Sequence, residues 1–356
     1  MRTADFDFDL PPELIAQHPA PRRDASRLLV LHRLDGQMEH RSFSDFTRFL
    51  KAGDVLVINN SRVIPARLRG ANARTGGQFE MLLLEEVARN DWWAMLRPGK
   101  RARPGTRIIC RNPDGTPSAV SAMVVETNPE GHRRLQFSGT PDLRRELDQL
   151  GEIPLPPYIE RQNQSPEDRE RYQTVYAQIA GSAAAPTAGL HFTADLLDRI
   201  RAVGAQICAV TLHIGPGTFA PVKAETPAGH VMHEERYELS EEAAQTIKDA
   251  KDEGRRVIAV GTTAVRVLET AAAAHNGKIA KNAGKTGIFI YPPFSFQIVD
   301  ALLTNFHLPR STLLMLVSAF AAPGETRGRD LVLAAYAEAI RQRYRFFSYG
   351  DAMLLL

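Results

Sequence analysis

The sequence predicts an α/β protein whose core domain is interrupted by a small all-β insertion. Three observations lead to this prediction. Short apolar runs at residues 28–31 and 55–58 are typical of buried strands. Residues 67–137 contain closely spaced β segments, separated by turns rich in Gly and Pro, with no helix between them. Beyond residue 190, helical segments alternate with apolar strands, which indicates a largely parallel sheet covered on both faces.

The insertion is predicted to be a small antiparallel β-barrel, because several strands follow one another without crossover helices. Its expected strands lie at residues 79–84, 92–96, 107–110, 119–125 and 133–137. A short helix at 142–150 and a rigid, proline-rich linker at 153–158 follow it. We therefore expect an inserted domain at 67–153 and a discontinuous α/β core domain at 1–66 and 154–356.

The core domain is expected to gain most of its helices after the linker. The predicted strands are at 207–214 and 256–260, with a further apolar run at 298–303. The predicted helices are at 196–203, 241–253, 263–275, from Ser311 onward, and at 329–344. Open α/β sheets bind ligands beyond the carboxyl ends of their strands, so the functional residues are expected there.

The composition excludes several classes of protein. The chain has 356 residues, enough for about two domains, and only two cysteines, far apart, so neither a disulfide scaffold nor a cysteine-built zinc site is expected. No apolar segment follows the N-terminus, and the longest apolar stretch, at 313–322, is well short of the roughly 20 residues of a membrane span. These features predict a cytoplasmic protein with no membrane association.

The net charge of +3 is too small to indicate nucleic-acid binding by itself, but its distribution is uneven. Residues 67–151 carry fourteen Lys or Arg against ten Asp or Glu, whereas the remainder is close to neutral. Arg97, Lys100, Arg101 and Arg103 follow one another with no acidic residue between them. They form either a solvated rim or a surface that contacts phosphates.

Polar residues follow the strand at 256–260. Thr262 and Thr263 open a helix that carries Arg266 one turn later, an arrangement suited to binding a ligand carboxylate at a helix N-terminus. Thr262 is expected to cap this helix while Thr263 or Arg266 faces the ligand, and a simple capped turn without a ligand is the alternative. The glycine spacings of a dinucleotide site and of a P-loop are absent from the sequence, so neither is predicted.

Histidines lie near other strand ends, where an open α/β sheet binds its ligands. His213 precedes a Gly-Pro-Gly turn, and a histidine satisfied within the core is the alternative there. His191 ends a loop of small residues containing Thr187, which lets a flat ligand approach the main chain. Asn305 and His307 lie two residues apart, so on an extended loop their side chains point the same way.

Two other segments contribute candidates. Asn59 and Arg62 follow the strand at 55–58, and Tyr349 and Asp351 end a C-terminal segment in which aromatic residues alternate with cations. Such a segment suits stacking on nucleobases as well as burial in the core. The histidines near residue 230 lack a helical ligand spacing, so no metal site is predicted.

Eight segments, in the same order along the chain, closely resemble the S-adenosylmethionine:tRNA ribosyltransferase-isomerase family of queuosine biosynthesis. They are DVLVINNSRVIPARL (54–68), PLPPYIER (154–161), YQTVY (172–176), AAPTAGLHF (184–192), VTLHIGPGTF (210–219), RVIAVGTTAVR (256–266), TNFHLPRSTLLMLVSAF (304–320) and YRFFSYGDAM (344–353). The inserted domain shows the least resemblance. One departure is Pro293, which stands where the family's Tyr-Pro-Gly would have glycine.

The resemblance implies a reaction that the composition does not reveal. The family uses S-adenosylmethionine as a ribosyl donor, and its other substrate is tRNA that carries an aminomethyl-deazaguanine at the wobble position. The products are epoxyqueuosine-tRNA, adenine and methionine. No permanently bound cofactor is implied, we expect a monomer, and a discontinuous α/β core with an inserted β-barrel is also the family's fold.

The resemblance also suggests roles for the candidate residues. At least one of His191, His213 and His307 is expected to transfer protons. The residues expected to bind the substrates are Thr187, Thr262, Thr263, Arg266, Asn305, Tyr349, Asp351, Asn59 and Arg62. Arg97, Lys100, Arg101 and Arg103 are expected to contact tRNA. A conventional RNA methyltransferase that uses the same donor, and a non-catalytic RNA-binding protein, are the alternative functions.

Overall fold

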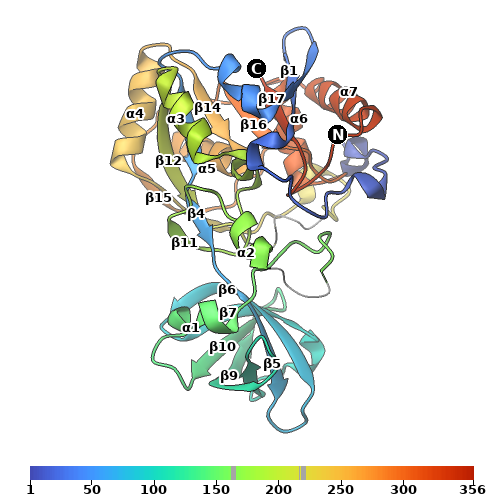
Figure 1. The fold of residues 1–356 in the computed structure, drawn as a ribbon, viewed down its shortest axis with the longest axis vertical. Coiled ribbons are helices and arrows are strands. Elements are labelled where there is room, and N and C mark those ends of the chain that lie inside the picture. Colours follow the sequence, from blue (N-terminus) through green and yellow to red (C-terminus); the bar gives the residue numbers. More distant parts are fainter. Residues whose placement is uncertain (162–165, 216, 218–221) are drawn as a thin grey trace.

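The computed structural model describes residues 1–161, 166–215, 217 and 222–356. Two parts are visible in Figure 1, an α/β core above and a β-barrel below, and both chain termini lie in the core. The sequence-based prediction of an α/β core with an inserted antiparallel barrel is confirmed. Residues 216, 218 and 219 of the expected Gly-Pro-Gly segment lie outside the described residues.

A nine-stranded sheet forms the centre of the core. Its strands are, in spatial order, β15 (Asn282–Thr286), β13 (Glu235–Leu239), β12 (Gln206–Leu212), β3 (Val55–Asn59), β14 (Val257–Val260), β16 (Ala301–Asn305), β17 (Ala352–Leu355), β1 (Arg27–Leu31) and β2 (Met38–Ser42). Strands β12, β3, β14 and β16 are parallel to one another. Strand β17 is antiparallel to β16, and β1 is parallel to β17. The carboxyl ends of the four central strands therefore share one edge of the sheet with the amino ends of β17 and β1.

Apolar residues cover both faces of this sheet because side chains alternate along each strand. In β3, Val55 and Val57 join one core cluster, whereas Leu56 and Ile58 join another on the opposite face. The first cluster includes residues of α4 (Glu241–Asp252), α5 (Gly261–Ala274), α6 (Thr312–Ala321) and α7 (Gly328–Arg341). The second includes residues of α3 (Ala194–Ala202) and of the 3-10 helix η4 (Phe43–Phe49). The helices thus lie on both faces, as the continuous apolar strands predict.

The inserted part is a closed barrel with the strand order β10-β7-β6-β5-β8-β9. The strands are β5 (Arg67–Asn72), β6 (Gln78–Ala88), β7 (Asp91–Arg97), β8 (Arg107–Arg111), β9 (Pro117–Thr127) and β10 (Arg133–Ser138). All neighbouring strands are antiparallel. Helix α1 (Leu143–Leu150) adds its leucines to the barrel's core cluster.

The edge of the sheet that holds the strand ends faces the barrel. Strand β3 ends there and continues into β4 (Ser61–Val63), which pairs with β11 (Ile179–Ser182), and the chain then enters the barrel at β5. Figure 1 shows β4, β11 and α2 (Pro166–Arg171) between the two parts. The remaining short 3-10 helices are η1 (Thr3–Phe6), η2 (Pro12–Leu14), η3 (Arg23–Ala25), η5 (Gly99–Arg101), η6 (Thr187–His191) and η8 (Pro227–Gly229).

Several strands lack the apolar signal on which sequence analysis depends. Strands β2, β5, β13 and β15 are rich in polar residues, and they were not expected. Pairing with neighbouring strands stabilises them, and a single sequence does not show this. Helix α5 begins at Gly261, with Val260 as its N-cap and no side-chain cap. The expectation that Thr262 caps this helix is therefore wrong.

Candidate active site

The candidate site lies at the strand-end edge of the core sheet. The segments that meet there are the carboxyl ends of β12, β3, β14 and β16, the amino ends of β17 and β1, and η6. Gly261 lies at the start of α5, and a Cβ atom placed there would be 3.6 Å from the Cβ of Ala188 in η6. Because neighbouring strands are about 4.8 Å apart, the edge from β12 to β16 spans roughly 15 Å.

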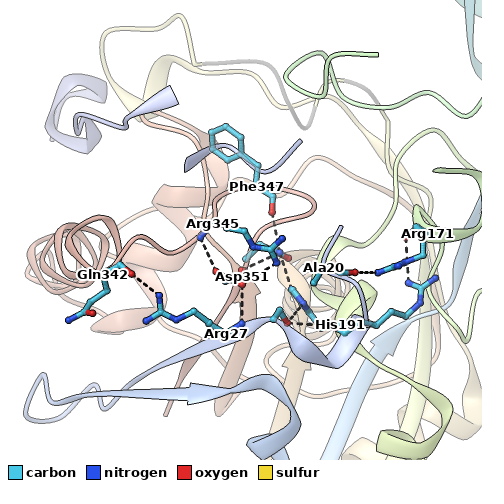
Figure 2. A network of polar contacts seen from close by, with 11 residues as sticks. Ala20, Arg27, Arg171, His191, Gln342, Arg345, Phe347 and Asp351 are labelled. Carbon is cyan, nitrogen blue, oxygen red and sulfur yellow. Dashed lines mark hydrogen bonds and ion pairs between the residues drawn. The ribbon is translucent and has the colours of Figure 1, made fainter. Parts of the chain in front are cut away.

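His191 is at the centre of a buried network (Figure 2). Its Nδ1 atom lies 2.7 Å from Oγ of Ser26, and its Nε2 atom lies 3.2 Å from Nδ2 of Asn305. The Asn305 amide also donates to the carbonyl oxygens of Phe347 and Asp351, at 3.3 and 3.4 Å. These contacts join the ends of β1, β16 and β17 to η6.

The network selects one tautomer of His191. The two carbonyl acceptors orient the Asn305 amide nitrogen, an N–H donor, toward Nε2, so Nε2 holds the lone pair and Nδ1 donates its proton to Ser26. Burial, together with the positive charges of Arg345 and Arg23, lowers the pKa of His191 to about 3. The ring is therefore neutral near pH 7, with Nε2 as the atom that can accept a proton.

The Asp351 carboxylate holds the beginning of β17 in place. It accepts hydrogen bonds from the backbone N–H groups of Arg27 and Arg345, at 2.9 and 2.8 Å, and lies 3.3 Å from the Arg345 guanidinium. Figure 2 shows this carboxylate between Arg27 and Arg345 and close to His191. Tyr349 donates its hydroxyl to Asp168, at 2.9 Å, and is buried.

A cavity opens beside His191. It is lined by Pro19, Ala20, Arg23, Ser26, Arg171, Leu190, His191, Arg345, Ser348, Tyr349 and Gly350. Of the site residues expected from the sequence, His191 and Tyr349 line this cavity, and the others do not. No expectation from the sequence concerned Arg23, Ser26 or Arg171. No local motif marks them, because they come from separate segments that only the fold brings together.

His213 lies at the same edge, at the end of β12, and is half-buried. Its ring packs against Gly181, where a Cβ atom would be only 2.8 Å from Nδ1, and its Nδ1 atom has no hydrogen-bond partner among the described residues. Burial, with smaller contributions from Arg236 and from Arg144 of the barrel, lowers the pKa of His213 to about 4. This ring is therefore also neutral near pH 7 and can accept a proton.

Arg266 is buried in the first turns of α5, and its charge is already balanced. Its guanidinium forms an ion pair with Glu235 of β13, and both side chains are almost completely buried. Glu235 also accepts a hydrogen bond from the backbone N–H of Gly215, at 2.8 Å. The pair thus joins α5, β13 and the segment after His213, and a carboxylate ligand would have to compete with Glu235 for Arg266.

The other candidate residues at the strand ends differ in whether their polar atoms already have hydrogen-bond partners. Asn59 uses both polar atoms to hold the end of β12, since it donates to the carbonyl of Leu212 and accepts from its N–H, each at 3.1 Å. Arg62 is exposed on β4, between the core edge and the barrel. Thr263 is buried, and its hydroxyl has no partner among the described residues.

The last three candidate residues of the site are two threonines and a histidine. Thr187 is half-buried at the start of η6, and Thr262 is buried in the first turn of α5. His307 is buried, its Nε2 lies 2.8 Å from Oγ1 of Thr304, and its backbone N–H donates to Tyr336. Asn305 instead contacts His191. The side chains of Asn305 and His307, which were expected to point the same way, therefore have different partners.

The basic run of the barrel follows the end of strand β7. Strand β7 ends at Arg97, and η5 follows it, with the Gly99 carbonyl accepting a hydrogen bond from Arg133 at 2.7 Å. Arg97, Lys100, Arg101 and Arg103 are all exposed. In the described ranges, none of the four side chains has an ion-pair partner. Their charges are therefore available to an anionic surface.

The described residues contain neither a candidate metal-binding cluster nor a helix that could span a membrane. No group of three or more His, Cys, Asp or Glu side chains in the described part of the chain is arranged to hold a metal ion. Among the helices of the same residues, none combines the length and the apolar character needed to cross a bilayer.

The fold and the site together define an α/β protein with a polar strand-end site beside a basic β-barrel. Comparison with known proteins identifies the family. The family model described as "Queuosine biosynthesis protein" matches residues 3–355, and the chain belongs to this family.

The relatives extend over the whole chain. Proteins named S-adenosylmethionine:tRNA ribosyltransferase-isomerase from Symbiobacterium thermophilum and Desulfitobacterium hafniense are 54% and 50% identical to it, over 100% of both chains in each case. The crystal structure of an S-adenosylmethionine tRNA ribosyltransferase from Thermotoga maritima matches 99% of this chain and 100% of its own. That match has a TM-score of 0.55 and 39% sequence identity.

Proposed function

We propose that this protein is an S-adenosylmethionine:tRNA ribosyltransferase-isomerase. It moves the ribosyl group of S-adenosylmethionine onto the aminomethyl-deazaguanine at the wobble position of tRNA, and it releases adenine and methionine. The observation that carries the proposal is the full-length identity of 50–54% to relatives of this name. The strand-end site beside a basic barrel suits a small donor and a large polyanionic acceptor.

The reaction requires bases that are neutral at physiological pH. The substrate amine must lose a proton in order to attack, and the positive sulfonium acidifies the adjacent ribose carbon. We propose His191 as a proton-transfer residue, because its neutral ring borders the cavity and its Nε2 holds a lone pair. His213 is the second candidate. His307 is a weaker one, because its ring bonds within its own segment.

We propose that the donor lies along the edge from α5 to β17. Thr187, Thr262 and Thr263 would meet it at the start of α5, where helix N–H groups favour negative or polar ligand atoms. The Asn305 Oδ1 atom, which has no partner among the described residues, is available to accept from adenine or a ribose hydroxyl. Tyr349 and Asp351 would close the site, as the family resemblance implies.

Three further residues have proposed supporting roles. Arg266 would act through Glu235 and Gly215, because its charge is already paired. Asn59 would position the end of β12, which carries His213. Arg62 is exposed between core and barrel, where a tRNA phosphate or another anionic group can reach it.

We propose that the barrel, as an inserted domain at 67–153, supplies a second contact with tRNA through Arg97, Lys100, Arg101 and Arg103. The core would comprise 1–66 and 154–356. Guanidinium and ammonium groups without acidic partners are suited to phosphate contacts, which position a nucleic acid without reading its sequence. We further propose a cytoplasmic monomer that carries no resident cofactor.

The decisive experiment uses the purified protein, S-adenosylmethionine labelled in the ribose, and tRNA that carries the aminomethyl-deazaguanine precursor. Transfer of the label to tRNA with release of adenine and methionine supports the proposal. Formation of S-adenosylhomocysteine identifies a methyltransferase. A donor that remains intact in the presence of bound tRNA identifies a non-catalytic RNA-binding protein.

A further inference from the structure

Three arginines line the cavity beside His191, and they come from separate segments. Arg23 lies in η3, Arg171 ends α2, and Arg345 precedes β17. Figure 2 shows His191 between the Arg345–Asp351 pair and Arg171. The cavity offers about 20 Å³, enough for little more than one water molecule. A space of this size can admit the oxygen atoms of an anionic group.

Arg23 has no ion-pair partner among the described residues, and Arg171 is paired only with an exposed carboxylate. Among the described residues, the Arg23 guanidinium donates to carbonyl oxygens only, those of Glu170, Leu190 and Arg171, at 2.9, 3.3 and 3.5 Å. Arg171 donates to the carbonyls of Ala20 and Pro21. Its nearest carboxylate is that of the exposed Glu167, at 3.6 Å. Carbonyl partners hold the Arg23 guanidinium in place but carry no negative charge to balance it.

The nearby carboxylates are largely committed elsewhere. Asp351 lies 3.3 Å from Arg345, but it also accepts two backbone hydrogen bonds. Asp168 pairs with Arg161 at 2.9 Å and accepts from Tyr349. Three guanidinium groups thus surround a cavity whose lining contains no acidic side chain. Burial lowers the pKa of the Arg23 guanidinium, and the nearby positive charge of Arg171 lowers it further.

We propose that Arg23, Arg171 and Arg345 form an oxyanion subsite that holds a carboxylate or phosphate group of a substrate next to His191. The inference rests on the proposed function, because both substrates of that reaction carry such a group. They are the methionine carboxylate of the donor and the backbone phosphates of tRNA. Arg266, which the sequence suggested for the carboxylate, is already paired with Glu235. A bound oxyanion would also place negative charge beside His191, and so favour its protonated form during proton transfer.

The test compares binding of the two substrates by single variants. Arg23→Gln and Arg345→Gln each remove one positive charge and keep an amide donor for the existing acceptors. Dissociation constants are measured by calorimetry for S-adenosylmethionine and, separately, for an anticodon stem-loop RNA that carries the precursor base. We expect a loss of about tenfold or more for the substrate that occupies the subsite, since a charge-assisted hydrogen bond is removed.

Arg33→Gln is the matched control. Arg33 is also partly buried, and its guanidinium donates to the carbonyls of Phe320 and Asp300, at 3.0 and 2.7 Å. It follows the carboxyl end of β1, at the edge of the sheet opposite to the site. If the variants lose affinity for S-adenosylmethionine alone, the subsite holds its carboxylate. If they lose affinity for the RNA alone, the subsite holds a phosphate. Affinities within twofold of the Arg33→Gln control for both substrates overturn the subsite.

Activity of the unaltered enzyme separates the two proposals. If it releases adenine while both variants bind both substrates normally, the subsite is wrong and the proposed function stands. If it consumes no donor and binds neither substrate, the proposed function fails, and the subsite fails with it. Should the variants not fold, sulfate is titrated against the unaltered enzyme at constant ionic strength. Competition with a substrate beyond that of chloride supports the subsite, and its absence overturns it.

Discussion

The Asn305 amide nitrogen lies 3.2 Å from Nε2 of His191, a residue 114 positions away in the chain. This contact crosses from the end of β16 to η6, and with the bond from His191 to Ser26 it sets the tautomer of the ring. A histidine that the sequence marks only as a candidate is thereby held neutral, oriented and next to a cavity lined by arginines.

Loss of the His191 ring should reduce turnover more than loss of the other two histidines. We expect His191→Ala to lower the rate of adenine release by ~10²-fold or more, because a positioned general base is removed. His213→Ala should have a smaller effect, and His307→Ala should act mainly on stability. Single-turnover assays and thermal unfolding, run on all three variants, check this. Unchanged turnover in all three would remove the histidines from the mechanism.

Ser26 should act through His191. Ser26→Ala removes the acceptor for the Nδ1 proton, so the ring loses its fixed tautomer. We expect kcat to fall by roughly 10- to 100-fold with little change in KM, by analogy with the loss of groups that orient catalytic or metal-binding histidines. Ser26→Thr keeps the hydroxyl and should recover most of the activity. Equal losses in the two variants would mean that the hydroxyl has no such role.

The buried histidines should make the protein sensitive to acid. Burial lowers the pKa of His307 to about 3, as it does for His191, whereas the ordinary value is 6.5. As the pH falls below 6.5 the unfolded state takes up these protons first, so stability is full above that pH and is lost progressively toward pH 3. At pH 5 the loss is about 2 kcal/mol for each histidine.

His307→Gln tests this effect by urea unfolding at pH 7 and pH 5. The fall in the free energy of unfolding between the two pH values should be smaller in the variant by about 2 kcal/mol. The exposed His18→Gln serves as the control and should leave the difference as it is. If His307→Gln and the unaltered protein have the same pH dependence of stability, the lowered pKa of His307 does not cause the sensitivity to acid.

Breaking the buried pair between Arg266 and Glu235 should be costly. Glu235→Gln leaves the Arg266 charge buried without a full counter-charge, and the expected loss is about 3–5 kcal/mol in the free energy of unfolding. The double variant Glu235→Gln/Arg266→Met should lose less than the two single losses added together, because no lone charge remains. Additive losses in denaturant unfolding would show that the two side chains are not coupled.

The basic run of the barrel should determine the salt dependence of tRNA binding. Neutralising Arg97, Lys100, Arg101 and Arg103 should flatten the plot of log affinity against log salt by a slope of roughly 0.7 to 0.9 per lost phosphate contact. Binding of free S-adenosylmethionine should not change. A variant neutralised at Arg201 and Lys248, which are exposed on α3 and α4, is the control. An unaltered slope would leave this run as ordinary surface.

The sequence predicted secondary structure best where buried elements have a continuous or periodic pattern of apolar residues. Strands β1, β3 and β14 were predicted to within one residue, because continuous apolar runs mark strands buried on both faces. The polar strands β13 and β15 were missed, because they are stabilised by pairing with neighbouring strands and carry no continuous apolar run. In the site, His191, Asn305, Tyr349 and Asp351 stood out in advance, whereas Ser26 and the cavity arginines did not.

The amino-acid order by itself determined the α/β class, the inserted barrel and the family, because these depend on local periodicity and on long motifs. Tertiary structure alone decided which candidates touch and which charges are already balanced. Strand β17 pairs between β16 and β1, and this register brings Asp351, Asn305 and Ser26 to one edge. Contacts between such distant segments depend on how strands pair across the sheet, and side-chain type does not record that pairing.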